Sequence, residues 1–183
     1  MVYLFLAEGF EEIEAVSTVD ILRRAGLKVK TVSINKKNVV GSHGITVVAD
    51  QIISECDFID AKALILPGGM PGSVNLGNCE QLCSQLHIAA KNNVLIAAIC
   101  AAPSVFIKEG LLNGRSFTCF SGFEHGDNTA VFTAQKTCVD LNGNPIITAN
   151  GPSAVNDFAL AIVKQLLGQS EYEEIRSAFL GRE

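Results

Sequence analysis

Several motifs that would assign this chain to a common class are absent from it. No apolar run is long enough to cross a membrane as a helix, so no membrane-spanning segment is predicted. No CxxC pair occurs, and Cys79 and Cys83 lack the further ligands that would complete a zinc site. Neither GxGxxG nor a Walker loop is present, which argues against a dinucleotide or nucleotide triphosphate site. We therefore expect no cofactor and no metal.

Positive charge is also scarce. The chain has 14 Lys and Arg against 19 Asp and Glu, a net charge of -5, and charged residues make up only 18% of it. The adjacent basic pairs are Arg23-Arg24 and Lys36-Lys37. A face that binds nucleic acid needs clustered basic side chains, so no specific nucleic-acid partner is predicted.

The length and the hydrophobic content are typical of a compact, enzyme-like chain. With 183 residues and 48% hydrophobic content, it can form one domain over residues 1–183 and bury about 70% of its unfolded surface. The apolar start at residues 1–6 has no preceding basic segment and leads into acidic residues, so we expect a first strand and not a signal peptide. Six irregularly spaced cysteines without a secretion signal favour reduced thiols and a cytoplasmic location.

Strand-like and helix-like segments alternate along the chain, as a doubly wound α/β sheet requires. A hairpin is predicted over 39–48 and short strands within 117–148, with Asn142-Gly143 as a turn between two of them. The predicted strands are 2–6, 28–34, 63–66 and 94–99, and the predicted helices are 12–25, 80–91, 152–167 and 171–179.

Cys100 is the strongest candidate for chemistry. It closes the apolar strand 94–99 and is followed by Ala101, Ala102 and Pro103 at the start of a helix-like run. A reactive side chain between a strand and a helix, with small neighbours, is typical of a nucleophile elbow, a strained turn that presents the nucleophile above the sheet. The amides of the new helix are expected to favour the thiolate. The alternative is a small buried hydrophobic residue.

Two further features lie at the carboxyl ends of predicted strands, where ligands bind in such sheets. Gly68 and Gly69 allow close approach of backbone amides to an oxyanion, although Pro-Gly-Gly is also an ordinary turn. Glu14 lies among apolar residues, so burial could raise its pKa until it carries a proton at neutral pH. The three histidines, His43, His87 and His125, are not expected beside Cys100.

Five segments together carry a resemblance that covers nearly the whole chain in order. They are LAEGFEEIEAV (6–16), DILRRAG (20–26), LPGG (66–69), AAICAAP (97–103) and NGP (150–152). These segments resemble the ThiJ/PfpI superfamily, and more narrowly its branch of the Parkinsonism-associated protein deglycase and YajL-like bacterial proteins. The resemblance implies a flavodoxin-like, class I glutamine amidotransferase-like fold: a three-layer sandwich with a mostly parallel central sheet, forming a homodimer.

The resemblance also assigns roles to residues. Cys100 matches the family's oxidisable nucleophile and Glu14 its protonated carboxyl partner. Gly69 and Ala101 match backbone donors of an oxyanion-like pocket, next to Gly68, and Gly151-Pro152 matches a pocket wall. Phe120 takes the place where some relatives carry a histidine.

Three functions follow from these matches as expectations. The first is a glutathione-independent glyoxalase or deglycase, acting on methylglyoxal-type α-oxoaldehydes or on the glycated proteins and amino acids they form. The second is a redox sensor or chaperone of oxidative stress, in which the same sulfur is oxidised. A peptidase or amidotransferase is the weaker alternative, because Ala101 stands where protease-like members have histidine.

Overall fold

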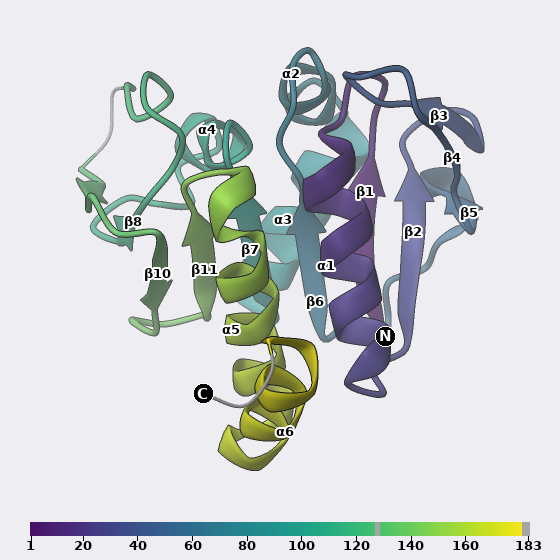
Figure 1. Ribbon diagram of the computed structural model, residues 1–183. Helices are drawn as coiled ribbons and strands as arrows, with labels where there is room; N and C mark the ends of the chain where they lie inside the picture. The colour runs from purple at the N-terminus through teal and green to yellow at the C-terminus, as the bar shows by residue number, and fades with distance from the viewer. Residues whose placement is uncertain (127–128, 181–183) are drawn as a thin grey trace.

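We describe a computed structural model that covers residues 1–126 and 129–180 (Figure 1). Among these residues, seven strands form one sheet in the order β10-β11-β7-β6-β1-β2-β5, in which every neighbouring pair is parallel except β10 and β11. The strands are β1 Val2–Leu6, β2 Val29–Ser33, β5 Gln51–Ile52, β6 Ala63–Leu66, β7 Leu95–Ile99, β10 Thr137–Asp140 and β11 Ile146–Ala149.

Helices cover both faces of this sheet. On one face, α1 and α5 lie against the strands with α6 below them, while α3 lies behind the sheet and α2 and α4 lie near its upper edge (Figure 1). The helices are α1 Glu12–Arg24, α2 Gly72–Gly77, α3 Glu80–Lys91, α4 Pro103–Lys108, α5 Val155–Leu167 and α6 Gln169–Leu180. The predicted three-layer α/β sandwich is confirmed.

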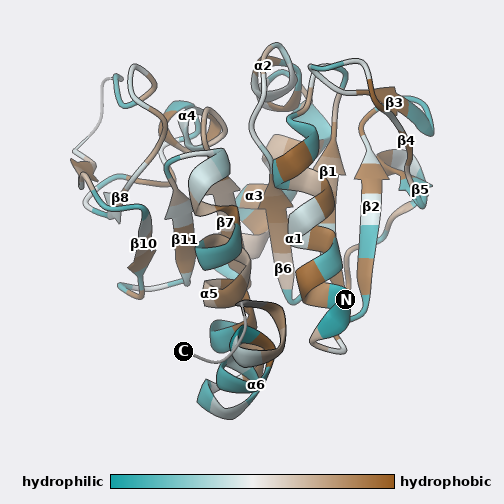
Figure 2. Cartoon of the chain, viewed as in Figure 1, coloured by the Kyte–Doolittle hydropathy of each residue, from teal (hydrophilic) through white to brown (hydrophobic). Residues whose placement is uncertain are grey.

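The central strands are hydrophobic along their whole length (Figure 2), because both of their faces are covered by helices. Side chains alternate between the two faces of a strand. In β1, Val2, Leu4 and Leu6 join the core beneath α1 and α5, whereas Tyr3 and Phe5 join the core beneath α3 and α4. The sheet therefore separates two hydrophobic cores.

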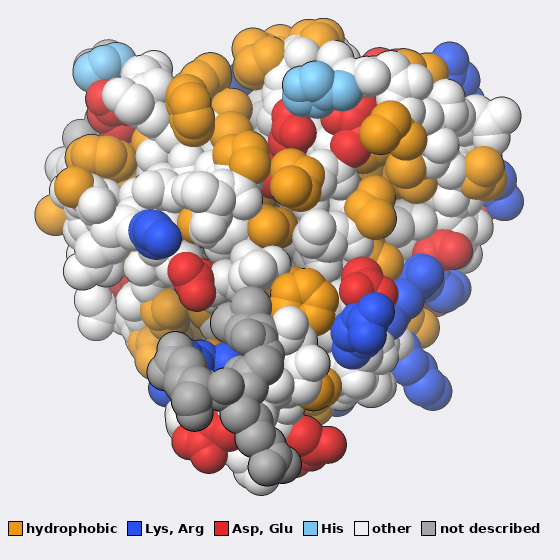
Figure 3. All heavy atoms as spheres, in the orientation of Figure 1, with side chains coloured by type: hydrophobic (Ala, Val, Ile, Leu, Met, Phe, Trp, Pro, Cys, Tyr) orange, Lys and Arg blue, Asp and Glu red, His pale blue; other side chains and the backbone are white. Residues whose placement is uncertain are grey.

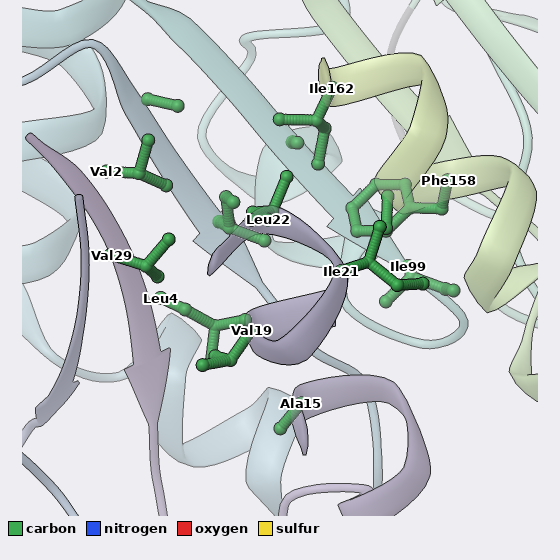
Figure 4. Packing of buried hydrophobic residues seen from close by; sticks show 14 of the residues in the cluster. Val2, Leu4, Ala15, Val19, Ile21, Leu22, Val29, Ile99, Phe158 and Ile162 are labelled. Atoms are coloured by element: carbon green, nitrogen blue, oxygen red, sulfur yellow. The ribbon is translucent and has the colours of Figure 1, made fainter. Parts of the chain in front are cut away.

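The core beneath α1 and α5 holds the site-bearing helix α1 in place. Ile21 and Leu22 of α1 and Phe158 of α5 are fully buried, and Figure 4 shows Ile21 beside Phe158 and Ile99 of β7. Phe158 thus links α5, α1 and the strand that ends at Cys100.

Two small two-stranded sheets lie outside the main one. The predicted hairpin is confirmed as β3 Asn38–Val40 paired antiparallel with β4 Thr46–Val48. The other pair is β8 Ser116–Phe117 with β9 Val131–Phe132, and these strands run parallel. The predicted turn at Asn142-Gly143 lies between the antiparallel strands β10 and β11, with Gly143 at φ +90°.

The bounds of three helices differ from the sequence prediction, and one of them, α6, spans Gln169–Leu180 where 171–179 was predicted. The first helix ends at Arg24, with Ala25 as its C-terminal cap, and the fifth begins at Val155, after a 3₁₀ turn η2 Pro152–Ala154. A second short 3₁₀ turn, η1, spans Ile53–Glu55. Helix α2 was not predicted, because it has six residues and contains two glycines, which are poor helix formers.

The direction in which successive strands are added to the sheet reverses between β1 and β6. From β1 the chain proceeds to β2 on one side, and from β6 to β7 on the other. Ligands bind such sheets beyond the carboxyl ends of the strands at this point, which is where the loops after β1 and β6 meet. No described helix has the length and apolar composition needed to cross a membrane.

Replacing Phe158 with Ala should lower the free energy of unfolding by about 3–5 kcal/mol, because it leaves a cavity between α1, α5 and β7. Urea denaturation followed by circular dichroism measures this. Ile59→Ala removes a side chain that is 89% exposed, and should change stability by less than about 0.5 kcal/mol. Equal losses in both variants would contradict this role of Phe158.

Candidate active site

Cys100 lies at a strained turn between β7 and α4. Its φ is +64°, a left-handed conformation that is uncommon for residues other than glycine. Its N–H donates to the Ala149 carbonyl at 2.8 Å, and its carbonyl accepts from the Phe120 N–H at 2.8 Å. Hydrogen bonds on both sides therefore hold the strained conformation, as the predicted nucleophile elbow requires.

The turn is crowded enough to demand small neighbours. A Cβ added to Gly68 would lie 2.6 Å from the Cys100 Cβ and 2.7 Å from the Glu14 Oε2. Ala101 and Ala102 are buried directly after the cysteine. Gly68 thus lets the loop after β6 approach the cysteine and the carboxyl group at once.

Glu14, in the first turn of α1, is fully buried against this loop. Its Oε2 accepts the Gly68 N–H at 2.7 Å, and the carboxyl group is also hydrogen-bonded with the Cys100 thiol. Burial raises the pKa of Glu14 to about 7, helped by the charge of Glu11 and opposed by the hydrogen bonds to Gly68 and Cys100. The expected burial and raised pKa of Glu14 are confirmed.

The pKa of Cys100 differs from the sequence expectation. Burial, together with the charge and the hydrogen bond of Glu14, raises the pKa of the Cys100 thiol to about 12. The N–H groups of Ala101 and Gly69 lower it, as expected, but they are outweighed. The predicted effect of the amides is therefore confirmed, but the net preference for the thiolate was wrong, because the prediction left out burial and the neighbouring carboxylate.

Cys100 and Glu14 therefore titrate as a unit that shares one proton. When the proton is on sulfur, the carboxylate opposes a second negative charge beside it. When the proton is on Glu14, that charge is gone and the carboxylic acid can donate a hydrogen bond to the thiolate. Attack by the sulfur thus couples directly to protonation of Glu14.

The loop after β6 also supplies Gly69, whose φ of +91° favours glycine. A Cβ there would lie 2.4 Å from the Glu11 nitrogen and 2.5 Å from the Gly9 carbonyl oxygen. The N–H groups of Gly69 and Ala101, both predicted donors, act together on the Cys100 sulfur. Two backbone donors that converge on a nucleophile can stabilise an oxyanion formed there.

Gly151 and Pro152 form one wall of a groove beside the cysteine, together with Phe120. A Cβ added to Gly151 would lie 3.1 Å from the Phe120 Cδ2, so the ring lies directly over this glycine. Phe120, which was predicted to stand where some relatives carry a histidine, lines this groove. Its side chain is 48% exposed.

A polar cluster above the site was not predicted. Glu12 Oε1 accepts the N–H groups of His43 at 2.8 Å and Ile45 at 3.2 Å, and its Oε2 lies 3.0 Å from the His43 Nδ1 and 3.2 Å from the Ser42 Oγ. Burial opposes ionisation of Glu12, but hydrogen bonds from its own backbone N–H, from His43 and from the Ile45 N–H outweigh it and lower its pKa to about 2. Glu12 therefore fastens the β3–β4 hairpin to the start of α1.

Ligand atoms of Glu11, Glu12 and His43 lie within 4.8 Å of one another, and no other such group of three occurs among the described residues. Both oxygens of Glu12 already accept hydrogen bonds from the hairpin, so this cluster has a structural explanation.

The six cysteines are free, and Cys119 and Cys138 are buried.

The fold and this turn define a class of protein: a flavodoxin-like α/β sandwich that carries a cysteine at a nucleophile elbow beside a buried carboxyl group. The DJ-1/PfpI family profile matches residues 1–165. The chain therefore belongs to the DJ-1/PfpI family.

Known proteins similar to this chain agree with that assignment. Protein DJ-1 homolog B of Arabidopsis thaliana is 36% identical over 97% of this chain, which spans only 40% of that relative's length. Glutathione-independent glyoxalase DJR-1.2 of Caenorhabditis elegans is 31% identical over 88% of this chain and 85% of its own. The structure of oxidized Toxoplasma gondii DJ-1 matches with a TM-score of 0.91 and 33% identity, covering 100% of this chain and 98% of that one.

Replacing Glu14 with Gln should lower the pKa of Cys100, because it removes the negative charge that raises it. Ultraviolet thiolate absorbance across a pH series, with the signal of a Cys100→Ser variant subtracted, measures this pKa. Glu80→Gln removes an exposed carboxylate on α3 and should leave it unchanged. An unchanged or higher pKa in Glu14→Gln would contradict the coupling of the two groups.

Proposed function

We propose that this protein is a cofactor-free, glutathione-independent glyoxalase that converts methylglyoxal-type α-oxoaldehydes to 2-hydroxy acids. The observation that carries this proposal is the buried Glu14 carboxyl group, with a pKa of about 7, in contact with Cys100. A general acid–base works best with a pKa near the operating pH, and a nucleophile needs such a partner within hydrogen-bond reach.

The first step is addition of sulfur to the aldehyde. The Cys100 sulfur bonds to the aldehyde carbon as its proton passes to Glu14, and the carbonyl electron pair becomes an oxyanion. Glu14 then gives that proton to the oxyanion, which leaves a hemithioacetal and an ionised Glu14. The N–H groups of Gly69 and Ala101 are positioned at the sulfur to hold that oxygen. Each donor of this kind is typically worth about 3 kcal/mol of barrier.

The second step moves a hydrogen between adjacent carbons. Ionised Glu14 takes the proton from the former aldehyde carbon, forming an enediolate, and returns a proton to the neighbouring carbon. The first carbon is oxidised to a thioester and the second is reduced to an alcohol, so no external oxidant or reductant is needed. Water then cleaves the thioester, releasing the hydroxy acid and the Cys100 thiol, and the net reaction adds one water to the aldehyde.

Early glycation adducts fit the same machinery. In a hemiaminal, the amine leaves as Glu14 gives a proton to its nitrogen, the hydroxyl proton returns to Glu14, and the released aldehyde enters the steps above. The similarity of this chain to the glutathione-independent glyoxalase DJR-1.2 of Caenorhabditis elegans supports this class of activity.

A second candidate function is redox sensing. The structure of Toxoplasma gondii DJ-1 is that of an oxidized form, which supports this candidate. In such a sensor, sulfinate on Cys100 would be stabilised by the donors proposed for the oxyanion. Turnover separates the functions, because a sensor would convert little methylglyoxal. A peptidase has less support, since Ala101 follows Cys100 where a histidine base would be needed.

Glu14→Gln should reduce methylglyoxal turnover by about 10²–10⁴-fold, the usual cost of losing a general acid–base, while the protein stays folded. Cys100→Ser should reduce it at least as far. The measurement is steady-state lactate formation without glutathione, with melting temperature as the control for folding. Parent-like turnover by Glu14→Gln would rule out Glu14 as the proton shuttle.

We also propose a homodimer built on α1. Ile13 and Val16 are 49% and 50% exposed, and Figure 3 shows hydrophobic side chains gathered over this helix. A shallow groove beside them is lined by Val16, Val19, Val47 and Val48, so the apolar surface continues onto the hairpin. The same patch on two subunits can form a closed interface about a two-fold axis.

Sedimentation velocity at micromolar concentration should show a dimer for the parent and a monomer for Val16→Asp, because a charge would be buried at the interface. Ile88→Asp changes an equally exposed side chain on α3, on the other face of the sheet, and should remain dimeric. A monomeric parent would contradict this proposal.

A further inference from the structure

A groove of about 330 Å³ lies next to the backbone segments that hydrogen-bond to Cys100. Its lining includes Phe120, whose N–H donates to the Cys100 carbonyl, and Asn150 and Gly151, which directly follow the Ala149 that accepts the Cys100 N–H. A substituent on a carbon bonded to the Cys100 sulfur therefore has this groove within reach. A methyl group needs only a small part of it.

Two half-exposed aromatic rings line the groove. Phe120 is 48% exposed and Phe132 is 43% exposed. Large apolar groups left in contact with solvent in a concave site are typical of ligand binding.

The ring of Phe132 is held in place before any ligand arrives. It packs edge-to-face on Phe117, with ring centroids 5.7 Å apart and an interplanar angle of 66°. Phe117 is 1% exposed and pairs with Phe132 in the β8–β9 ladder, and the Thr133 N–H donates to the Phe117 carbonyl at 2.7 Å. A fixed aromatic wall loses little conformational entropy when a second ring packs on it.

One residue of the groove wall has an unpaired polar atom. The Oδ1 atom of Asn150, a lining residue, is buried and has no hydrogen-bond partner among the described residues. Buried polar atoms are nearly always paired in folded proteins. A hydroxyl group of a hydrated α-oxoaldehyde, or of the 2-hydroxy acid formed from it, is a donor that would pair with this oxygen once the Asn150 side chain rotates toward the groove.

From these observations we propose that the groove is the binding site for the substrate's substituent, and that aromatic α-oxoaldehydes are the favoured substrate class. The proposal rests on the glyoxalase function above and names Phe132 as a specificity-determining residue. The chemistry is unchanged: with phenylglyoxal, sulfur addition, transfer of hydrogen between the two carbons and thioester hydrolysis add one water and give mandelate.

The test compares kcat/KM for phenylglyoxal with kcat/KM for methylglyoxal in each variant. Because the ratio is taken relative to the parent, the different intrinsic reactivities of the two aldehydes cancel. Phe132→Ala should lower the ratio by about tenfold, because the aromatic contact and the apolar area it buries are lost. Phe132→Tyr keeps the ring and should retain the ratio within about twofold.

Val131→Ala is the matched control, since Val131 is the neighbouring residue of β9, is 55% exposed and does not line the groove. Its ratio should equal that of the parent. An unchanged ratio in a folded Phe132→Ala protein would overturn the inference while leaving the glyoxalase function intact.

Absence of turnover with both aldehydes in the parent would instead refute the glyoxalase function. Binding then decides the role of the groove. Calorimetry should show the parent binding mandelate at least about tenfold more tightly than lactate, with the difference lost in Phe132→Ala and kept in Phe132→Tyr. Equal affinities for the two acids in the parent would overturn the inference.

Discussion

The site depends on one contact, in which the Glu14 carboxyl group and the Cys100 thiol lie side by side against Gly68, a residue without a side chain. Gly68 makes this possible, because a Cβ at that position would overlap both Cys100 and Glu14. Its N–H also gives Glu14 a hydrogen bond, so the carboxyl group is buried without being wholly unpaired. Burial then raises both pKa values, and the two groups share a proton between them.

The sheet supplies the rigidity that this contact needs. Loops after β6 and β7 meet because the two strands are parallel neighbours, and their register places Leu66 opposite Ala98. The left-handed conformation of Cys100 costs free energy, of the order of 1–3 kcal/mol for such a residue. Hydrogen bonds with Ala149 and Phe120 hold it there, and thereby connect the cysteine to β11 and to the groove.

Two neighbouring regions give the site its surroundings. On one side, Glu12 fixes the β3–β4 hairpin against α1, in the turn of helix that also carries Glu14. On the other side, Phe120 and Phe132 line the groove. Nucleophile and acid–base groups come from the core of the sheet, while the groove walls come from loops and small strands, which can change without disturbing the core.

The sequence by itself determined the layers of the fold and the two central residues of the site. Continuous apolar runs identify buried parallel strands, and Cys100 between a strand and small residues marks a strained turn, because both signals are local. The pKa of Cys100 was decided only by the tertiary structure. Glu14 is far from Cys100 in sequence, and the burial of the thiol cannot be inferred from the residues next to it in the chain. The same reason applies to the contact of Glu12 with His43 and to the groove wall at Phe132, which join segments that only the folded sheet brings together.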